Sequence, residues 1–165
     1  MERFAIPGAG AIIRRSKDGC EQILLQERCK KDTPLENGLL EIPAGKIREF
    51  ESIYDTIRRE VKEETGLDIV KIEGEEESSI HAVNGYKVLN FKPFSCSQNL
   101  EGAYPIMVFT FVCTAEGTLL RSSDEARNFI WAGHEELSKM LAETPERIYP
   151  MHVDTLRKFL KCKAS

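Results

Sequence analysis

The stretch GKIREFESIYDTIRREVKEETGL, residues 45–67, combines the signals of one amphipathic helix with a high density of charge. Ser52 is followed three residues later by Asp55, a pattern typical of a capping box at a helix N-terminus. Gly66 follows the last residue of the apolar period, and glycine readily adopts the left-handed conformation of a C-terminal cap. The pattern therefore predicts a helix over residues 51–65 with defined ends.

The charged residues of this helix are not confined to one side. At about 100° per residue, three apolar residues define the buried stripe: Ile53, Ile57 and Val61. Three charged residues fall on the opposite side, where we expect solvent: Asp55, Arg58 and Lys62. Glu60, Glu63 and Glu64 instead fall at about 340°, 280° and 20° from the first isoleucine, beside or inside the apolar stripe.

Three acids beside an apolar stripe need positive partners. Buried carboxylates are costly unless they are paired or bind a metal ion. Arg59 lies one helical turn before Glu63 and can pair with it, but one arginine cannot neutralise three acids. Clustered carboxylate oxygens are the ligands that Mg²⁺ or Mn²⁺ prefers. From the residues alone two interpretations stay open, a solvated face with ion pairs and a divalent cation site.

The composition limits the class of protein. A chain of 165 residues can bury a core of its own, so we expect a single domain over residues 1–165. The net charge of −4 argues against a nucleic-acid partner. Five scattered cysteines without metal-ligand spacing indicate reduced thiols in the cytoplasm. No stretch approaches the roughly 20 apolar residues of a membrane helix, so we expect no membrane partner.

Eight short runs, most of them rich in Val, Ile, Phe or Thr, are separated by turn residues and predict β-strands. They are GAIIRR, QILLQER, GLLEIPAG, LDIVKIEG, SSIHAV, YKVLNF, PIMVFTFVCT and NFIWAG. The tetrapeptide SKDG at residues 16–19 and the pair Asn84-Gly85 predict hairpin turns, so part of the sheet should be antiparallel. Helical periodicity returns near residues 135–141 and 149–160. The pattern predicts an α/β or α+β fold, with helices packed on a mixed sheet.

The spacing within residues 45–67 resembles the complete signature of the Nudix hydrolases. The matching positions are Gly45, Glu51, Arg59, Glu60, Val61, Glu63, Glu64, Gly66 and Leu67. This resemblance implies an α/β/α sandwich around a mixed sheet and a loop, helix and loop that bind a divalent metal. It also implies hydrolysis within the phosphate chain of a nucleoside diphosphate linked to another group.

The resemblance assigns roles to the residues of the signature. The metal ligands, for Mg²⁺ or Mn²⁺, would be Glu60, Glu63 and Glu64. Glu64 or Glu60 would lie nearest to the attacking water, and Arg59 would orient the glutamates. The residues that support the loop and backbone would be Gly45, Glu51 and Gly66.

Charged residues outside the signature extend these expectations. Arg28 resembles the arginine or lysine that family members carry for phosphate or ribose; the other interpretation is a solubilising charge on an edge strand. Glu125 is a candidate general base or outer metal ligand, or else a plain surface acid. Three loop lysines are candidates to screen an anionic substrate, or else plain surface charges: Lys30, Lys31 and Lys46. No catalytic role is expected for the isolated histidines, which are His81, His134 and His152.

The stretch EIPAGKI, residues 41–47, bears on the substrate. Its PAG looks like the ADP-ribose and nucleotide-sugar pyrophosphatases, in which Glu41 would be an additional metal ligand, but the downstream proline of that subgroup is absent. ADP-ribose or a nucleotide sugar is therefore favoured slightly over a (d)NTP or a dinucleoside polyphosphate. The alternative is a nucleotide-binding or regulatory Nudix module without catalysis. Either form is compatible with a homodimer.

Overall fold

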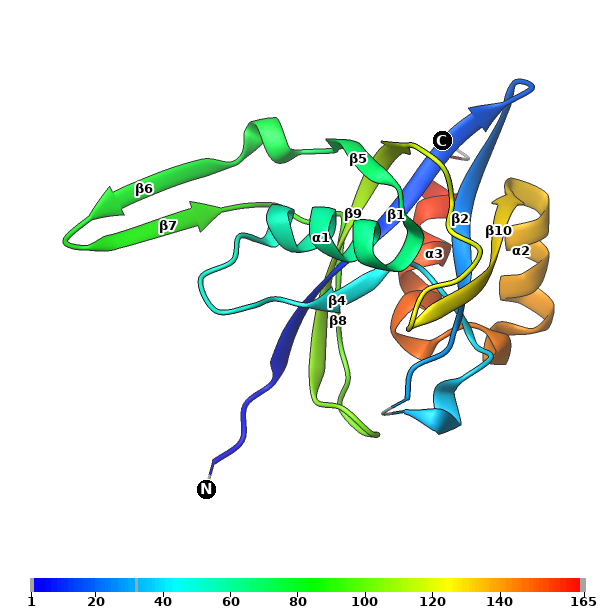
Figure 1. Ribbon diagram of the computed structural model, residues 1–165, viewed down its shortest axis with the longest axis horizontal. Helices are drawn as coiled ribbons and strands as arrows, with labels where there is room; N and C mark the ends of the chain where they lie inside the picture. The colour runs from blue at the N-terminus through cyan, green and yellow to red at the C-terminus, as the bar shows by residue number, and fades with distance from the viewer. Residues whose placement is uncertain (1, 32, 164–165) are drawn as a thin grey trace.

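A mixed β-sheet with helices on both faces dominates the computed structural model, which describes residues 2–31 and 33–163 (Figure 1). Within these residues the sheet has eight strands, in the order β10-β2-β1-β9-β5, with β3 beside β2, β4 beside β1 and β8 beside β9. The strands are β1 (Ile6–Lys17), β2 (Cys20–Arg28), β3 (Leu40–Glu41), β4 (Ala44–Lys46), β5 (Asp68–Ile72), β8 (Ser95–Gln98), β9 (Ile106–Glu116) and β10 (Ala126–Gly133). The α-helices are α1 (Ile53–Thr65), α2 (His134–Glu143) and α3 (Pro150–Lys163). Short 3-10 turns cover Pro34–Glu36, Glu75–Glu77 and Pro145–Arg147.

The strand directions make the sheet mixed, as predicted. Strands β1 and β9 pair in parallel, whereas β1 pairs with β2 and β4 in the antiparallel direction. Asp18 and Gly19, with φ of 52° and 77°, form the turn between β1 and β2. Asn84 and Gly85, with φ of 51° and 81°, join a separate antiparallel hairpin. Positive φ at both central positions is typical of tight hairpin turns, so both predicted turns are confirmed.

The alternation of side chains along β1 divides the core in two. Ala11 and Ile13 lie in the core beneath α1, whereas Ile12 lies in the core shared with α2 and α3. On its side α1 contributes the predicted stripe of Ile53, Ile57 and Val61. Because helices cover both faces of the sheet, the predicted α/β/α sandwich is confirmed (Figure 1).

The ends of α1 follow the signals in the sequence. The Ser52 hydroxyl accepts a hydrogen bond from the Asp55 backbone N–H at 3.1 Å, which satisfies one free donor of the first turn. Gly66 has φ of 80°, and its N–H donates to the Lys62 carbonyl at 3.0 Å. The helix begins at Ile53 rather than at residue 51 because the capping serine has extended backbone angles.

The strands differ from the sequence prediction in two places. Strand β8 is absent from the predicted strands because its sequence, SCSQ, has no apolar alternation. The predicted run GLLEIPAG is one segment in sequence but two strands in the structure, and it is interrupted at Ile42 and Pro43. Its second half, β4, pairs with β1 and leads directly toward α1.

A hairpin of β6 (Ser79–Val83) and β7 (Tyr86–Asn90) forms a second sheet that projects beyond α1 (Figure 1). Ile80, Val83 and Tyr86 are exposed along it. No helix within residues 2–31 and 33–163 is both long enough and apolar enough to cross a membrane. The single domain over residues 1–165 stays a prediction.

Candidate active site

The start of the signature lies where β4 approaches α1. Gly45 pairs with Ala9 of β1 and lies directly against the side chain of Glu60. A Cβ atom added at Gly45 would be 2.0 Å from the carboxyl carbon of Glu60. A larger residue here would require the Glu60 carboxylate to move. The structural role that the resemblance assigns to Gly45 stays a prediction.

A two-point contact between Arg59 and Glu51 holds the loop that enters α1. Arg59 donates from Nε to Glu51 Oε1 at 2.7 Å and from Nη2 to Oε2 at 2.8 Å. Glu51 also accepts from the Arg48 backbone N–H at 3.1 Å and from the Thr56 hydroxyl at 2.8 Å. The hydrogen bond from Arg59, supported by these donors, lowers the pKa of Glu51 to about 2. Glu51 is therefore a fixed anion that joins loop and helix.

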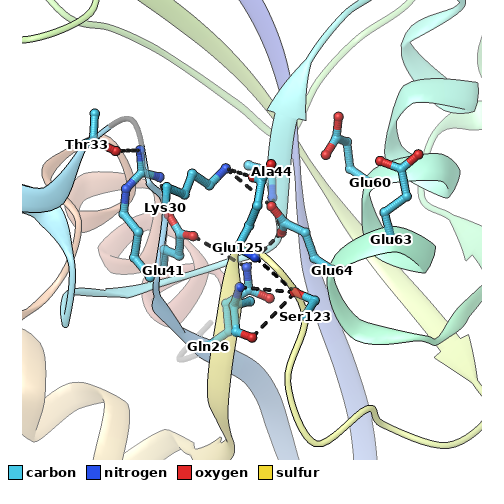
Figure 2. Close-up of polar contacts among 12 residues, drawn as sticks. Gln26, Lys30, Thr33, Glu41, Ala44, Glu60, Glu63, Glu64, Ser123 and Glu125 are labelled. Atoms are coloured by element: carbon cyan, nitrogen blue, oxygen red, sulfur yellow. Dashed lines mark hydrogen bonds and ion pairs between the residues drawn. The ribbon is translucent and has the colours of Figure 1, made fainter.

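Glu64 is the most enclosed acid of the signature, with 2% of its surface exposed. Its carboxylate accepts from Gln26 Nε2 at 2.7 Å and from the Ala44 backbone N–H at 3.2 Å, and it lies 3.4 Å from the Lys30 ammonium (Figure 2). Burial raises the pKa of Glu64 above its ordinary value, and the donors around it offset only part of this effect. Gln26 and Ala44 were not recognised as site residues from the sequence, because strands distant in sequence place them here.

Glu60 and Glu63 extend from α1 near Glu64 (Figure 2), and all three line one cavity. Glu60 is half-buried and accepts from Arg59, and burial raises its pKa. The Glu63 side chain is 53% exposed and lies 3.4 Å from Arg59 and 3.7 Å from Arg48. Its exposure corrects the expectation that Glu63 is withdrawn from water beside the apolar stripe.

The side of α1 opposite the apolar stripe was predicted, from the angle of about 100° per residue, to carry solvent-exposed charges. Asp55 and Lys62 are exposed, as predicted. Arg58 is only half-exposed, because it donates to Glu75 at 2.6 Å. The expectation that Arg58 faces solvent is therefore met only in part, with 39% of its side chain exposed.

The loop before β10 brings a further acid to the end of β2. Ala126 pairs with Arg28, and the Cys29 backbone N–H donates to the Glu125 carbonyl at 2.8 Å. This pairing places the Glu125 carboxylate 2.6 Å from the Lys30 ammonium, although the two residues are far apart in sequence. A cavity of about 330 Å³ is lined by Glu60, Glu63, Glu64, Ser123, Asp124 and Glu125. The structure therefore brings Glu125 to the acids of the signature.

Glu41 and Arg28 form a buried pair on the adjacent strands. Arg28 donates to Glu41 at 2.7 Å and lies 2.8 Å from Glu36, and its guanidinium stacks 4.5 Å from the ring centre of Tyr149. Arg28 is only 6% exposed, so it is not a solubilising surface charge. Burial raises the pKa of Glu41, and Arg28 opposes the rise. Arg28 thus occupies the carboxylate that the sequence suggested as an additional metal ligand.

A second cavity, of about 210 Å³, shares Glu60 and Glu125 with the first. It is lined by Arg28, Lys30, Glu41, Ala44, Gly45, Lys46, Glu60, Tyr104, Ile106, Val108, Glu125, Tyr149 and His152. Lys46 lies over the Tyr104 ring at 5.4 Å. Cations with aromatic rings beside them suit a ligand that has an anionic part and a planar part.

His152 lines this cavity and was assigned no role from the sequence. It is 1% exposed, and among the described residues neither ring nitrogen has a hydrogen-bond partner. Burial, with the nearby positive charges of Arg28 and Lys30, lowers the pKa of His152 to about 3. Its spacing of four and seven residues from Leu156 and Phe159 could have placed it on the buried face of α3.

The donor set of the first cavity suits a hard divalent cation. It consists of carboxylate oxygens, which Mg²⁺ and Mn²⁺ prefer. In residues 2–31 and 33–163, however, no three acidic, histidine or cysteine side chains converge around one metal position. Lysine and arginine side chains now neutralise these acids. The carboxylate oxygens are therefore suitable ligands for Mg²⁺ or Mn²⁺. Metal binding would require the ion to replace some of the lysine and arginine partners of these acids.

Comparisons with known proteins identify the family and the fold. A family model described as the NUDIX domain matches residues 5–152. The chain therefore belongs to the Nudix family. The NUDIX domain of Shewanella oneidensis NrtR, solved in complex with ADP ribose, has the same fold, with a TM-score of 0.65 at 14% identity over 99% of this chain and 91% of that one.

Two relatives match over shorter segments. The methanol dehydrogenase activator of Bacillus methanolicus is 39% identical over 67 residues, which are 41% of this chain and 34% of that protein. The 8-oxo-dGDP phosphatase NUDT18 of Danio rerio is 39% identical over 59 residues, 36% of this chain and 16% of that protein. The chain thus matches about a third or less of the length of these relatives.

Proposed function

We propose that this protein is a Mg²⁺- or Mn²⁺-dependent pyrophosphohydrolase that cleaves the phosphoanhydride of a nucleoside diphosphate linked to another group. One observation carries the proposal: an acid-lined cavity, which the buried Glu64 carboxylate lines, meets a cation-lined cavity at Glu60 and Glu125, which line both. Such a junction would hold a metal on one side and phosphate oxygens on the other.

The metal would be held by Glu60, Glu63 and Glu64, with Glu125 as a further or outer ligand. A bound divalent ion neutralises phosphate oxygens and lowers the pKa of a bound water. Gln26 and the Ala44 N–H orient the Glu64 carboxylate by the hydrogen bonds at 2.7 and 3.2 Å. Glu41 would serve only if Arg28 released it.

The protein side chains would position water and phosphate for one displacement. Water oxygen forms a bond to phosphorus, the bridging P–O bond breaks, and a carboxylate takes the water proton. Glu64 or Glu60 would lie nearest to this water, and Glu125 is the other candidate base. Arg59 orients Glu60, with which it is paired. Across the second cavity, Arg28 and Lys46 would bind the phosphate oxygens.

Among substrates we favour ADP-ribose or a nucleotide sugar, with a (d)NTP or dinucleoside polyphosphate as alternatives. Tyr104 and Tyr149 line the part of the cavity where a base or sugar would lie. The similar proteins differ in their ligands: the NrtR domain was solved with ADP ribose, and the Danio relative is an 8-oxo-dGDP phosphatase. The five cysteines, all without disulfides in the described residues, support a cytoplasmic location. A homodimer stays a prediction.

A second candidate function is a nucleotide-binding module without catalysis. The observation in its favour is that cations already neutralise the acids, which do not converge on one metal position in the described chain. The intact set of glutamates favours the enzyme, because a binding module would tolerate the loss of at least one.

A metal-supplemented substrate screen separates the two. The purified protein is incubated with Mg²⁺ or Mn²⁺ and with ADP-ribose, nucleotide sugars, dinucleoside polyphosphates and (d)NTPs, and phosphate is measured after treatment with a phosphatase. The enzyme hypothesis predicts turnover that disappears with a chelator. Metal-dependent ligand binding without turnover on any of these compounds would instead support the binding module.

A further inference from the structure

Lys30 lies between two of the acids that the proposed function assigns to the metal, Glu64 and Glu125. Its ammonium is 2.6 Å from Glu125 and 3.4 Å from Glu64, and only 15% of its side chain is exposed (Figure 2). Glu41 adds a third negative charge nearby. A positive charge at this position balances the buried Glu64 and Glu41 carboxylates and the exposed Glu125 carboxylate.

The two cations of this region differ in how firmly they are held. Arg28 is fixed by Glu41, Glu36 and Thr33 and by the Tyr149 ring. The Lys30 ammonium pairs with the Glu64 and Glu125 carboxylates from the end of a flexible four-carbon chain. Lys30 is therefore the cation that can move without dismantling the surrounding pairs.

Glu64 would keep its position if Lys30 moved. Gln26 and the Ala44 backbone N–H both donate to Oε2, whereas Lys30 lies nearest to Oε1. Withdrawal of the ammonium would leave Oε1 open and the carboxylate oriented. An incoming cation would therefore meet a preformed ligand.

On the basis of the proposed function, we propose that Lys30 is the internal counter-ion of the metal-free site, and that a divalent metal binds by displacing its ammonium from Glu64 and Glu125. Lys30 also lines the second cavity, beside Arg28 and Lys46. The displaced ammonium would be within reach of an anionic substrate there. Metal and substrate would consequently strengthen each other's binding, because each favours the same position of Lys30.

Mn²⁺ binding to the substrate-free protein tests this competition without any turnover. Free Mn²⁺ is measured by electron paramagnetic resonance for the wild type and for Lys30→Met, which keeps the chain length but removes the charge. Because the competing ammonium is gone, the variant should bind Mn²⁺ at least about 5-fold more tightly, the lower end of common coupling strengths. Lys30→Arg, which keeps a cation, should remain close to the wild type.

Lys31→Met is the matched control, because Lys31 is the adjacent residue and is exposed. It removes the same charge from the same loop and should change the Mn²⁺ affinity by less than about twofold, since solvent screens exposed charges. Equal or weaker Mn²⁺ binding by Lys30→Met than by Lys31→Met, with both variants folded by circular dichroism, would overturn the proposal.

A Glu64→Gln variant keeps this failure distinct from failure of the proposed function. If Glu64→Gln weakens Mn²⁺ binding but Lys30→Met does not strengthen it, only the counter-ion role is wrong. If Glu64→Gln binds Mn²⁺ as the wild type does, the metal is not at Glu64, and both proposals fail.

Discussion

Arg59 of α1 donates two hydrogen bonds, of 2.7 and 2.8 Å, to the carboxylate of Glu51, which lies eight residues earlier in the loop before the helix. The same guanidinium donates to the Lys46 carbonyl at 3.1 Å and contacts Glu60. Arg59 therefore ties both ends of the loop between β4 and α1 to the helix that carries the acids. Planar, bidentate contacts of this kind are specific to arginine.

Glu51→Gln should destabilise the protein by on the order of 1 to 2 kcal/mol, since it weakens charge-assisted hydrogen bonds of a partly buried pair. Urea unfolding measures the change. Glu49→Gln, in the same loop but exposed, is the control and should leave the free energy of unfolding unchanged. Equal stability of the two variants would show that the clamp contributes nothing.

Gly45→Ala should displace the Glu60 side chain, because the added methyl would lie 2.0 Å from its carboxyl carbon. We expect kcat to fall on the order of 10- to 100-fold, the range for a small misplacement of a catalytic group. Gly133→Ala is the control, since nothing lies within 4 Å of its added Cβ. Full activity in Gly45→Ala would mean that the position of Glu60 does not matter.

His152 should make the protein less stable in mild acid. Its folded-state pKa is lowered to about 3, against 6.5 for the ordinary value, so below pH 6.5 the unfolded chain binds a proton that the folded chain excludes. The stability contributed by neutral His152 is full above pH 6.5 and decreases by about 1.4 kcal/mol per pH unit as the pH falls toward 3.

Urea unfolding between pH 4 and 7 measures this slope. In His152→Phe the slope should be smaller by about 1.4 kcal/mol per pH unit, which corresponds to one proton. His81→Phe, on the exposed hairpin, should keep the slope of the wild type. Identical pH dependence in wild type and His152→Phe would show that the imidazole is protonated in the folded state.

Local signals were enough to predict most of the fold. The apolar stripe of α1 and its capping residues, Ser52 and Gly66, depend on neighbours in sequence, and the structure has them where expected. The polar strand β8 lacked such a signal, because its pairing with β9 is a matter of backbone hydrogen bonds.

The site was predicted less completely because its contacts are distant in sequence. The wheel placed Glu64 in the apolar stripe correctly, but it could not show that Gln26 and Ala44 hydrogen-bond to it. The same angles predicted that Glu63 is withdrawn from water, but its side chain is 53% exposed. The angle of a residue on a helix does not show how far the packed sheet extends over that helix. The Lys30 to Glu125 pair depends on the register of β10 against β2, which no short pattern encodes.

The roles assigned to these residues stay predictions until activity is measured. Glu125 and the acids of α1 line one cavity, which makes a shared metal site testable. Arg28 is buried against Glu41, so its role in phosphate binding must be tested apart from its role in stability.

The most direct measurement is the turnover of the wild type and Glu64→Gln on the best compound of the substrate panel, with Mg²⁺ in excess. Glutamine keeps the shape of the side chain and one acceptor, but removes the charge. The account predicts that Glu64→Gln folds normally, by circular dichroism and urea unfolding, and that its kcat is lower by on the order of 10² or more. Undiminished turnover by folded Glu64→Gln would contradict it.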